Sequence, residues 1–503
     1  MQRSWSSKPT TDIIAYRRWF SSALATRTPM RLKHKLIIAF SIFAVSYLVK
    51  SLQAVDLAHV MYTYEQPFSG LTETYDQRAA SILAGEGLLG PYDIKPSRTV
   101  WIAQAPGYSI FLSAVYALVG NDFFKVQLVQ NAVNSLSPIL IFLIAGHALS
   151  WRAGAVAGFL SAVSHHLSHI SNFILPDSIS ALPLLAGFYL MVLGRRSPKR
   201  AYLLFACAGV MFGLGAWLRS QTMLMALSFT PLLALISAPR GRAVRLAAVM
   251  GFASLLAITP ITIKNYIVYG EFVPINIGMG IVLWEGIGES SDRFGAVARD
   301  EEVAEQDALV FDNPRYAKTW SSPDGIMRDR ARIRKSLDII VHNPGWYAGV
   351  MFKRIKDMLK YSAHATLVYR PSEVRPRTPQ FPVRKLWEGR VPDGSALAFG
   401  ESLFWLRPPA RFFQRIAKET AIFFIVIGAA LVFLASPRRG LLLMMCPLYY
   451  FTFQAFMHTE FRYTLPMQYF MFVFASVTWV ALASAIRAGL GKYFAPLRRG
   501  GSL

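Results

Sequence analysis

Long apolar runs, separated by short polar segments, dominate the pattern of this chain. A helix needs roughly 20 apolar residues to cross a bilayer. Runs close to that length occur at 36–54, 126–149, 154–173, 178–193, 201–218, 221–237, 246–263, 421–435, 441–457 and 466–486. The pattern therefore predicts an all-α polytopic membrane protein with about ten transmembrane helices.

The positive charge is confined to one set of connecting segments. These segments hold 22 Lys/Arg and one acid, Asp12, so they carry +21 of the formal net charge of +24. They lie at 1–35, 150–153, 194–200, 238–245, 436–440 and 487–503. Because basic loops stay on the cytoplasmic side, both termini are expected in the cytoplasm and the alternate loops outside.

Composition supports this class and excludes others. Hydrophobic residues make up 53% of the chain and charged residues only 16%. A pI near 10.1 would favour nucleic-acid binding in a soluble protein, but membrane orientation explains it here, so no nucleic-acid partner is expected. The first span has no small-residue cleavage pattern and is expected to be retained. Cys207 and Cys446 both fall in spans, which argues against a disulfide framework.

The spans divide the chain into five parts. We expect a cytoplasmic N-terminus at 1–35, a transmembrane core at 36–263, an external region with a mixed cap at 264–420, C-terminal spans at 421–486 and a cytoplasmic tail at 487–503. The first external loop, 55–125, should carry amphipathic helices. Its apolar stretch from Pro106 to Gly120 is too short to span and is expected on the outer surface. In the cap, Asn343-Pro344 predicts a helix start, and the amphipathic helix that follows suits either a lipid surface or packing within its own domain.

Charged residues gather where the predicted spans reach the outer face. They are Asp76, Asp177, Arg219, Lys264 with Asn265, and Glu460 with Arg462. Singly, the cations are as easily read as anchors at the membrane surface and the aspartates as helix caps. Together, the two aspartates and the three cations at one membrane depth indicate a site for an anionic, membrane-embedded substrate.

Three other polar patterns carry less chemical information. Gln127, Asn131 and Asn134 form a stripe at helical spacing that should face protein or a wet cavity. His165 and His169 of the HHLSH motif share a helical face, which is a weak zinc signal, and polar packing is the favoured interpretation. Gly278-Met279-Gly280 lacks the strand and helix context of a nucleotide site and is assigned to loop geometry.

The ordered motifs resemble a known enzyme family. They are YDQRAASILAGEGL, WIAQAPGYSIFLSAVYALVGNDFFKVQLVQNAV, LPDS, GLGAWLRSQ, PITIKNYIVYGEFVPINIGMGIVLWEG and HTEFRYTLPM. Over 60–290 and 440–470 the chain resembles the family 39 glycosyltransferases of the GT-C fold, which include protein O-mannosyltransferases and bacterial enzymes that add aminoarabinose or galacturonic acid to lipid A and its core. The chain has Ala105-Pro106-Gly107 where many members have a double proline, and Asp177 where others often have glutamate.

The resemblance implies a reaction and a set of roles. Family members pass a sugar from a polyprenyl-phosphate donor to an acceptor on the outer face of the inner membrane, and this acceptor is lipid A, core oligosaccharide, another envelope glycan or a protein. Asp76 would be the general base, with Asp177 as a second catalytic carboxylate that orients the acceptor or binds metal. The resemblance also implies two sets of binding residues: Arg219, Lys264 and Arg462 for the donor phosphate, and Tyr75, Gln104, Tyr108, Asn131, Asn265 and Glu460 for substrate. Because a lipid-phosphate donor carries its own leaving group, no metal or other cofactor is expected.

Two other functions stay open at this stage. A lipid or glycan transporter would place buried charges along a pathway through the membrane, whereas these charges gather at one face. A non-catalytic envelope assembly protein would use the external charges only to shape an interface. Substitution of Asp76 by alanine separates an enzyme from a scaffold, because only the enzyme should lose a covalent product.

Overall fold

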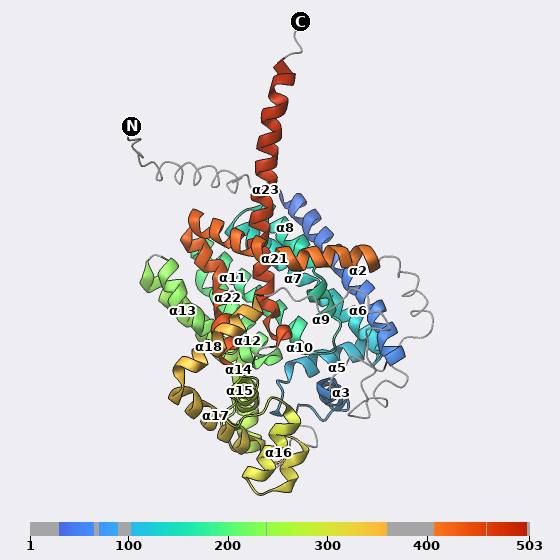
Figure 1. The fold of residues 1–503 in the computed structure, drawn as a ribbon, viewed down its shortest axis with the longest axis vertical. Coiled ribbons are helices and arrows are strands. Elements are labelled where there is room, and N and C mark those ends of the chain that lie inside the picture. Colours follow the sequence, from blue (N-terminus) through green and yellow to red (C-terminus); the bar gives the residue numbers. More distant parts are fainter. Residues whose placement is uncertain are drawn as a thin grey trace, which may run out of the picture.

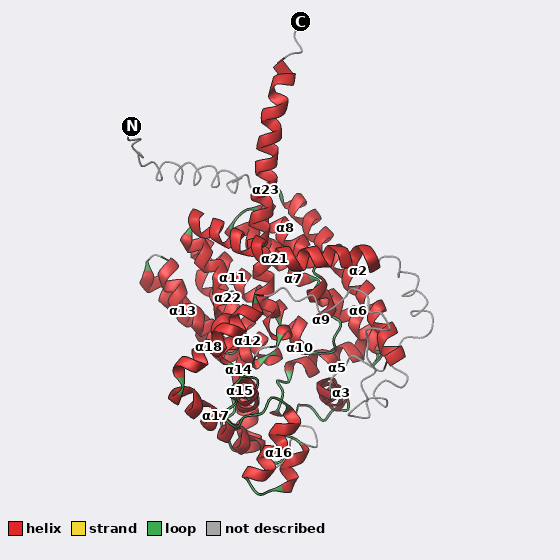
Figure 2. Ribbon diagram, viewed as in Figure 1, coloured by secondary structure: helices red, strands yellow, loops and turns green. Residues whose placement is uncertain are grey.

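The computed structural model describes residues 30–64, 70–88, 102–237, 239–359, 407–458 and 460–499. Every regular element in these ranges is a helix (Figure 2). The predicted all-α class is therefore confirmed. Most of the predicted cytoplasmic N-terminus and residues 360–406 of the predicted external region lie outside the described residues.

Two groups of helices build the molecule. The core contains α2 (Leu32–Tyr64), α6 (Phe123–Asn134), α7 (Leu136–Ala148), α8 (Trp151–Ala162), α9 (His165–Ile170), α10 (Pro176–Ile179), α11 (Ala181–Arg196), α12 (Ala201–Leu218), α13 (Met225–Ile236), α14 (Arg240–Tyr269), α21 (Arg407–Ala435), α22 (Pro437–Phe456) and α23 (Leu465–Arg499). Outside it lie α3 (Gly70–Leu83), α5 (Gly107–Val119), α15 (Met279–Gly288), α16 (Asp300–Val310), α17 (Gly325–His342) and α18 (Pro344–Met358). Short 3-10 turns include η3 (Ser220–Thr222), η4 (Pro314–Lys318) and η7 (Phe461–Thr464).

Seven helical stretches of the described residues are long and apolar enough to cross a membrane, which makes this a multi-pass membrane protein. They are Leu32–Val55, Phe123–Ala148, Pro176–Arg196, Pro198–Leu218, Arg240–Tyr269, Arg415–Ala435 and Arg462–Arg487. The other three predicted spans correspond to α8 with α9, to α13 and to α22. The expected number of about ten spans is not confirmed, in part because the third predicted span breaks between α8 and α9, where Ser164 caps α9.

Aromatic rings and small residues pack the core. Phe188 makes edge-to-face contacts with Phe229 and Phe470, at centroid distances of 6.2 and 4.7 Å, and Phe212 contacts Phe229 at 5.6 Å. These rings come from α11, α12, α13 and α23, so they join helices that are far apart in the sequence. Such edge-to-face contacts add to the stabilisation from apolar burial.

Helices α15, α16 and α17 lie at one end of the molecule, and the last turns of α23 project from the other (Figure 1). The predicted cytoplasmic tail, which begins at 487, is therefore opposite α15, α16 and α17. The direction of the chain relative to the cytoplasm remains a prediction.

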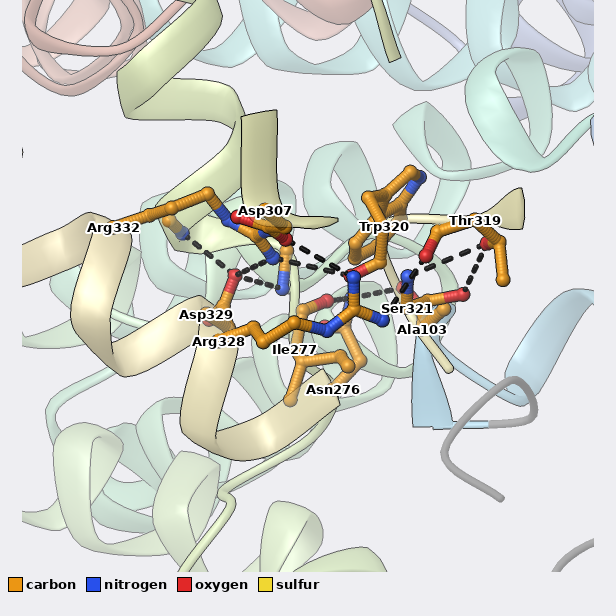
Figure 3. A network of polar contacts seen from close by, with 12 residues as sticks. Ala103, Asn276, Ile277, Asp307, Thr319, Trp320, Ser321, Arg328, Asp329 and Arg332 are labelled. Carbon is orange, nitrogen blue, oxygen red and sulfur yellow. Dashed lines mark hydrogen bonds and ion pairs between the residues drawn. The ribbon is translucent and has the colours of Figure 1, made fainter. Parts of the chain in front are cut away.

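A buried network of arginines and aspartates holds the outer helices together (Figure 3). Arg328 and Arg332 of α17 both donate to the carboxylate of Asp307 on α16. Asp329, also on α17, accepts from the backbone N–H groups of Gly278 and Gly280 at 3.1 and 2.9 Å. Asp329 thus caps the N-terminus of α15 from another helix. The predicted loop geometry at Gly278 agrees with its φ of 125°.

The predicted helix start at Asn343-Pro344 is confirmed by α18. Its Tyr347 and Arg354 side chains are buried against α15 and α22, whereas Phe352 is 71% exposed. Of the two interpretations of this amphipathic helix, packing within the protein holds for the face that carries Tyr347 and Arg354.

Candidate functional site

A buried ion pair joins two of the predicted site residues. Asp177 lies in the first turn of α10, and its Oδ1 accepts a hydrogen bond from Nη2 of Arg219, the residue that ends α12. The Asp177 side chain is 1% exposed and that of Arg219 19%. The second oxygen, Oδ2, is buried and accepts no hydrogen bond from the described residues. Such a buried carboxylate oxygen is suited to accept a hydrogen bond from a hydroxyl group of a ligand.

Tyr463 places Arg219 beside a second predicted cation. The guanidinium of Arg219 lies 4.8 Å from the Tyr463 ring centroid, and that of Arg462 lies 5.2 Å from the same centroid. Gln221 of η3 fixes this segment by donating to the Tyr463 carbonyl at 2.9 Å. Arg462 in turn pairs with Glu460, with 2.5 Å between Nε and Oε2. The predicted residues of HTEFRYTLP are thus brought to the end of α12.

A pocket with two cations in its lining lies where α5, α12 and α14 meet. Its volume is about 70 Å³, and its lining includes Arg78, Gln104, Trp217, Lys264 and Asn265. Among the described residues, the lining contains no carboxylate. Nη1 of Arg78 donates to the Gln104 carbonyl at 3.1 Å, which ties α3 to the start of α5. A largely apolar pocket whose two charged lining residues, Arg78 and Lys264, are both cations is suited to bind an anion.

The first external loop supplies the remaining predicted catalytic residue. Asp76 on α3 is 5% exposed, and its Oδ1 accepts from the Tyr116 hydroxyl on α5 at 2.6 Å. Its neighbour Tyr75 packs edge-to-face on Tyr108, with 5.1 Å between centroids. The predicted outer-surface helix is therefore α5, which packs on α3 and is not among the candidate spans.

Tyr75 connects the ion pair with the pocket. Burial raises the pKa of the Tyr75 hydroxyl to about 12, and the charges of Arg219, Asp177 and Arg78 all act on it. Arg219 and Asp177 form the ion pair, and Arg78 lines the pocket. Tyr75 is thus close enough to both the ion pair and Arg78 of the pocket to be affected by their charges.

Three of the predicted substrate contacts are hydrogen-bonded within the protein. Asn131 donates to Asn172 at 2.8 Å and to the Lys50 carbonyl at 3.2 Å. Asn265 donates to the carbonyls of Val273 and Ile275, both at 2.9 Å. The Tyr108 hydroxyl donates to Gln130 at 2.7 Å. These bonds position α6, α9 and the loop after α14, and Asn265 also reaches the pocket.

The polar stripe on α6 faces protein, as predicted. Gln127, Asn131 and Asn134 are at most 1% exposed. Gln127 donates to the Asn172 carbonyl at 2.8 Å and Asn134 to Ser178 at 2.9 Å, next to Asp177. The stripe therefore supports the loop and turn that carry Asp177.

The histidine motif adjoins this network, because the Ser168 carbonyl accepts from Asn172 at 2.8 Å. His165, His166 and His169 are buried on α9, and the rings of His165 and His169 are 6.1 Å apart. Among the described residues, no group of three or more His, Cys, Asp or Glu side chains is placed to hold a metal ion.

Charge pairing shifts the pKa values of His458 and Glu460 in the segment after α22. His458 lies 2.9 Å from Glu289 and 3.7 Å from Glu460, measured between ring nitrogens and carboxylate oxygens. Burial acts to lower the pKa of His458, but the two carboxylates raise it to about 9. Burial acts to raise the pKa of Glu460, but His458 and Arg462 lower it to about 2. Both residues are therefore charged near neutral pH.

Sequence reasoning missed Arg78, Trp217, Tyr463 and His458. Each stands within three residues of a predicted one, in YDQR, WLR and HTEFRY. Their proximity to predicted residues was the available signal, since an aromatic or basic side chain at a helix end is otherwise ordinary.

Comparisons with known proteins identify the fold. Residues 103–264 match the family model described as dolichyl-phosphate-mannose-protein mannosyltransferase. No curated protein matches. The Archaeoglobus fulgidus oligosaccharyltransferase in complex with Zn and sulfate is similar at a TM-score of 0.51 and 12% identity, over 91% of this chain and 51% of that one. Its apo form gives 0.51 and 13%, over 91% and 52%. ArnT from Cupriavidus metallidurans gives 0.36 and 14%, over 91% and 79%.

These matches confirm the GT-C fold that the sequence predicted. The chain spans about half the length of the oligosaccharyltransferase structures. The family match covers the segment from the start of α5 to Lys264 on α14, which includes Asp177 and Arg219.

Proposed function

We propose, from a GT-C fold whose residues 103–264 match the mannosyltransferase family model, that this protein is a glycosyltransferase that uses a polyprenyl-phosphate-linked sugar. The acceptor would be a cell-envelope molecule: lipid A, core oligosaccharide, another glycan or a protein. The reaction would take place on the outer face of a bacterial inner membrane. The family description itself names a sugar linked to a lipid phosphate, which supports a donor of this class.

The observation that supports the proposal is the pocket that Arg78 and Lys264 line, in which Trp217 of α12 stands two residues before Arg219. A polyprenyl-phosphate donor presents an anionic phosphate at the membrane surface, next to a neutral sugar. Arg78 and Lys264 in the pocket lining offer positive charge, and the part of the lining that the structure describes holds no competing acid. Arg219 and Arg462, on either side of the link through Tyr463, add two guanidiniums to the same end of the core.

The proposed step is a displacement at the anomeric carbon of the donor. The acceptor hydroxyl oxygen forms a bond to this carbon as the bond from carbon to the phosphate oxygen breaks. The hydroxyl proton passes to a carboxylate, and polyprenyl phosphate leaves with the electron pair of the broken bond. Negative charge grows on the phosphate, so preorganised cations there lower the barrier, typically by about 3–4 kcal/mol for each essential partner.

The two carboxylates have different surroundings, which suggests different roles. Asp76 accepts a hydrogen bond from the neutral Tyr116 hydroxyl, whereas Asp177 is paired with the Arg219 cation. We assign Asp76 as the general base. Asp177 would orient the acceptor through its Oδ2, while Arg219 holds the carboxylate in place. A base must come within about 3 Å of the hydroxyl in the bound state.

Metal independence is part of the proposal. The phosphate leaving group is charged from the start, and protein cations are available at the pocket to stabilise it. Because the donor carries one phosphate rather than a diphosphate, no divalent ion is needed to neutralise the leaving group.

The decisive test starts from cells in which this protein has been deleted. These cells are complemented with wild type, Asp76→Asn or Glu73→Gln and compared with the deletion itself. Glu73 lies one turn before Asp76 on α3 and is exposed, so Glu73→Gln removes a charge from the same helix without touching the site. Mass spectrometry of envelope lipids, glycans and proteins would follow the covalent product. We expect a pentose, hexose or uronic acid increment with wild type and Glu73→Gln, and its loss with Asp76→Asn at equal membrane abundance.

Two results would count against the proposal. Full restoration by Asp76→Asn would remove Asp76 as the base. An absence of any covalent difference between the deletion and wild type would favour a transporter or an assembly protein instead.

A further inference from the structure

The segment 457–464, which carries Arg462 and Tyr463, is held by helices of the external region. Arg354 on α18 donates to the Ala455 carbonyl at 2.9 Å and also to the carbonyls of Met457 and Gly286. The Tyr347 hydroxyl donates to the Phe456 carbonyl. Four backbone positions on α15 and at the end of α22 are thus fixed by two side chains from α18.

His458 makes the next contact along this segment. Its Nδ1 lies 2.9 Å from Oε2 of Glu289, the residue that ends α15. Its Nε2 lies 3.7 Å from Oε1 of Glu460. Only 12% of the His458 side chain is exposed. The imidazole therefore lies between a carboxylate of the external region, which it contacts at hydrogen-bond distance, and a carboxylate of the site segment, which it contacts as an ion pair.

Glu460 connects His458 with the cations of the site, because it contacts both His458 and Arg462. Its second oxygen holds Arg462, whose guanidinium faces the Tyr463 ring, and Arg219 contacts the same ring. Arg219 is paired with Asp177. A continuous series of charged and ring contacts thus runs from Glu289 on α15 to Asp177 on α10.

We propose that His458 is a positioning residue, which holds Arg462 and Tyr463 in register with Arg219 by bridging Glu289 and Glu460. The consequence for donor binding rests on the proposed function. The bridge itself does not, because it follows from the contacts alone.

The bridge requires the charged form of the imidazole. The imidazole can hydrogen-bond Glu289 through Nδ1, and only a positive charge on the ring also attracts Glu460, whose Oε1 lies 3.7 Å from Nε2 as an ion-pair contact. The ionisable groups that face His458 are Glu285 and Glu289 from α15, Arg354 from α18, and Glu460, Arg462 and Tyr463 from its own segment. Burial acts to lower the pKa of His458 from its usual 6.5, and Glu289 and Glu460 outweigh this effect and raise the pKa to about 9.

The sign of the pH dependence follows from this raised pKa. The stabilising contribution of the imidazolium is fully present below about pH 6.5 and is lost as the pH rises through about 9. His458→Gln keeps a donor but removes the charge at every pH. His458→Arg keeps a charge with several donors, and this charge does not titrate below pH 10.

The test uses the full chain in lipid nanodiscs and radiolabelled polyprenyl phosphate as the probe. We expect His458→Gln to weaken binding about tenfold at pH 7, the size of effect typical for one charge-assisted contact. His458→Arg should bind like wild type at pH 7 and better than wild type at pH 10. His342→Gln is the matched control, since His342 is an exposed histidine of α17 that pairs with Asp338.

Hydrogen exchange of the peptide that covers 457–464 provides a readout independent of the ligand. Exchange should be faster in His458→Gln than in wild type or His342→Gln. Equal exchange and equal binding in all three proteins would overturn the positioning role. If wild type binds no polyprenyl phosphate while His458→Gln still loosens 457–464, the donor assignment fails and the bridge stands.

Discussion

Replacement of Asp307 by asparagine should open the external helices while leaving the core intact. Asp307 Oδ2 accepts from Nη1 of Arg328 at 3.0 Å and from Nη1 of Arg332. The side chains of these arginines are 0% and 6% exposed (Figure 3). Burial lowers the pKa of the Arg328 guanidinium, and Asp307 acts against this effect. Asparagine supplies an oxygen acceptor but no charge, so two buried cations would lose their shared counter-ion.

The expected cost follows from the burial of all three groups. Removal of one member of a buried ion pair typically costs about 3–5 kcal/mol, because a charge is left uncompensated. Asp329 offsets this only weakly, since its Oδ1 is 3.9 Å from Arg332 and already accepts two backbone N–H groups. At about 1.4 kcal/mol per factor of ten, the open population should rise by roughly two to four orders of magnitude.

Hydrogen exchange on the detergent-solubilised protein measures this population directly. Peptides from α16 and α17 should lose protection in Asp307→Asn, whereas peptides from α12 and α14 should not. Glu305→Gln is the control, because Glu305 is exposed on the same helix. A triple variant with Asp307→Leu, Arg328→Met and Arg332→Leu should recover much of the protection, since no unpaired charge remains.

The reasoning would be refuted by protection in Asp307→Asn equal to that in Glu305→Gln. It would also be refuted by a triple variant that is less protected than the single one. The first result would mean that Asp307 does not compensate the buried arginines. The second would mean that packing, rather than charge pairing, holds α16 to α17.

Three further predictions concern the core and the site. Gly209→Ala should destabilise the fold by about 1–3 kcal/mol and lower the yield of monodisperse protein in size-exclusion chromatography. Its new Cβ would lie 2.1 Å from the Met250 carbonyl oxygen. Gly241→Ala is the control and should behave as wild type, because no atom lies within 4 Å of its new Cβ. Arg78→Met and Lys264→Met should each weaken polyprenyl phosphate binding about tenfold or more, and unchanged binding in both would exclude the pocket as the phosphate site. Chelation with EDTA should leave the transfer rate unchanged, and a loss of activity restored by a divalent ion would contradict metal independence.

Much of the candidate site could be predicted because its residues stand at helix ends. Asp177, Arg219 and Lys264 are polar positions that interrupt or end apolar runs, so hydropathy alone marks them. Their gathering at one end follows from the alternation of spans. Asn131 and Asn265 show the limit of this reasoning, because an amide at such a position can hydrogen-bond a ligand or a backbone carbonyl equally well. In the structure both amides donate hydrogen bonds to the protein itself.

The sequence by itself determined the membrane class, the all-helical structure and the end of the core where the charges gather. These properties depend on local physics, since a run of about 20 apolar residues in lipid must satisfy its own backbone hydrogen bonds by forming a helix. Only the tertiary structure decided that Arg78 joins Lys264 at one pocket, that Tyr463 lies between Arg462 and Arg219, and that His458 meets Glu289 from 169 positions away. Such contacts depend on how distant helices pack, and no periodicity within a single helix encodes that packing.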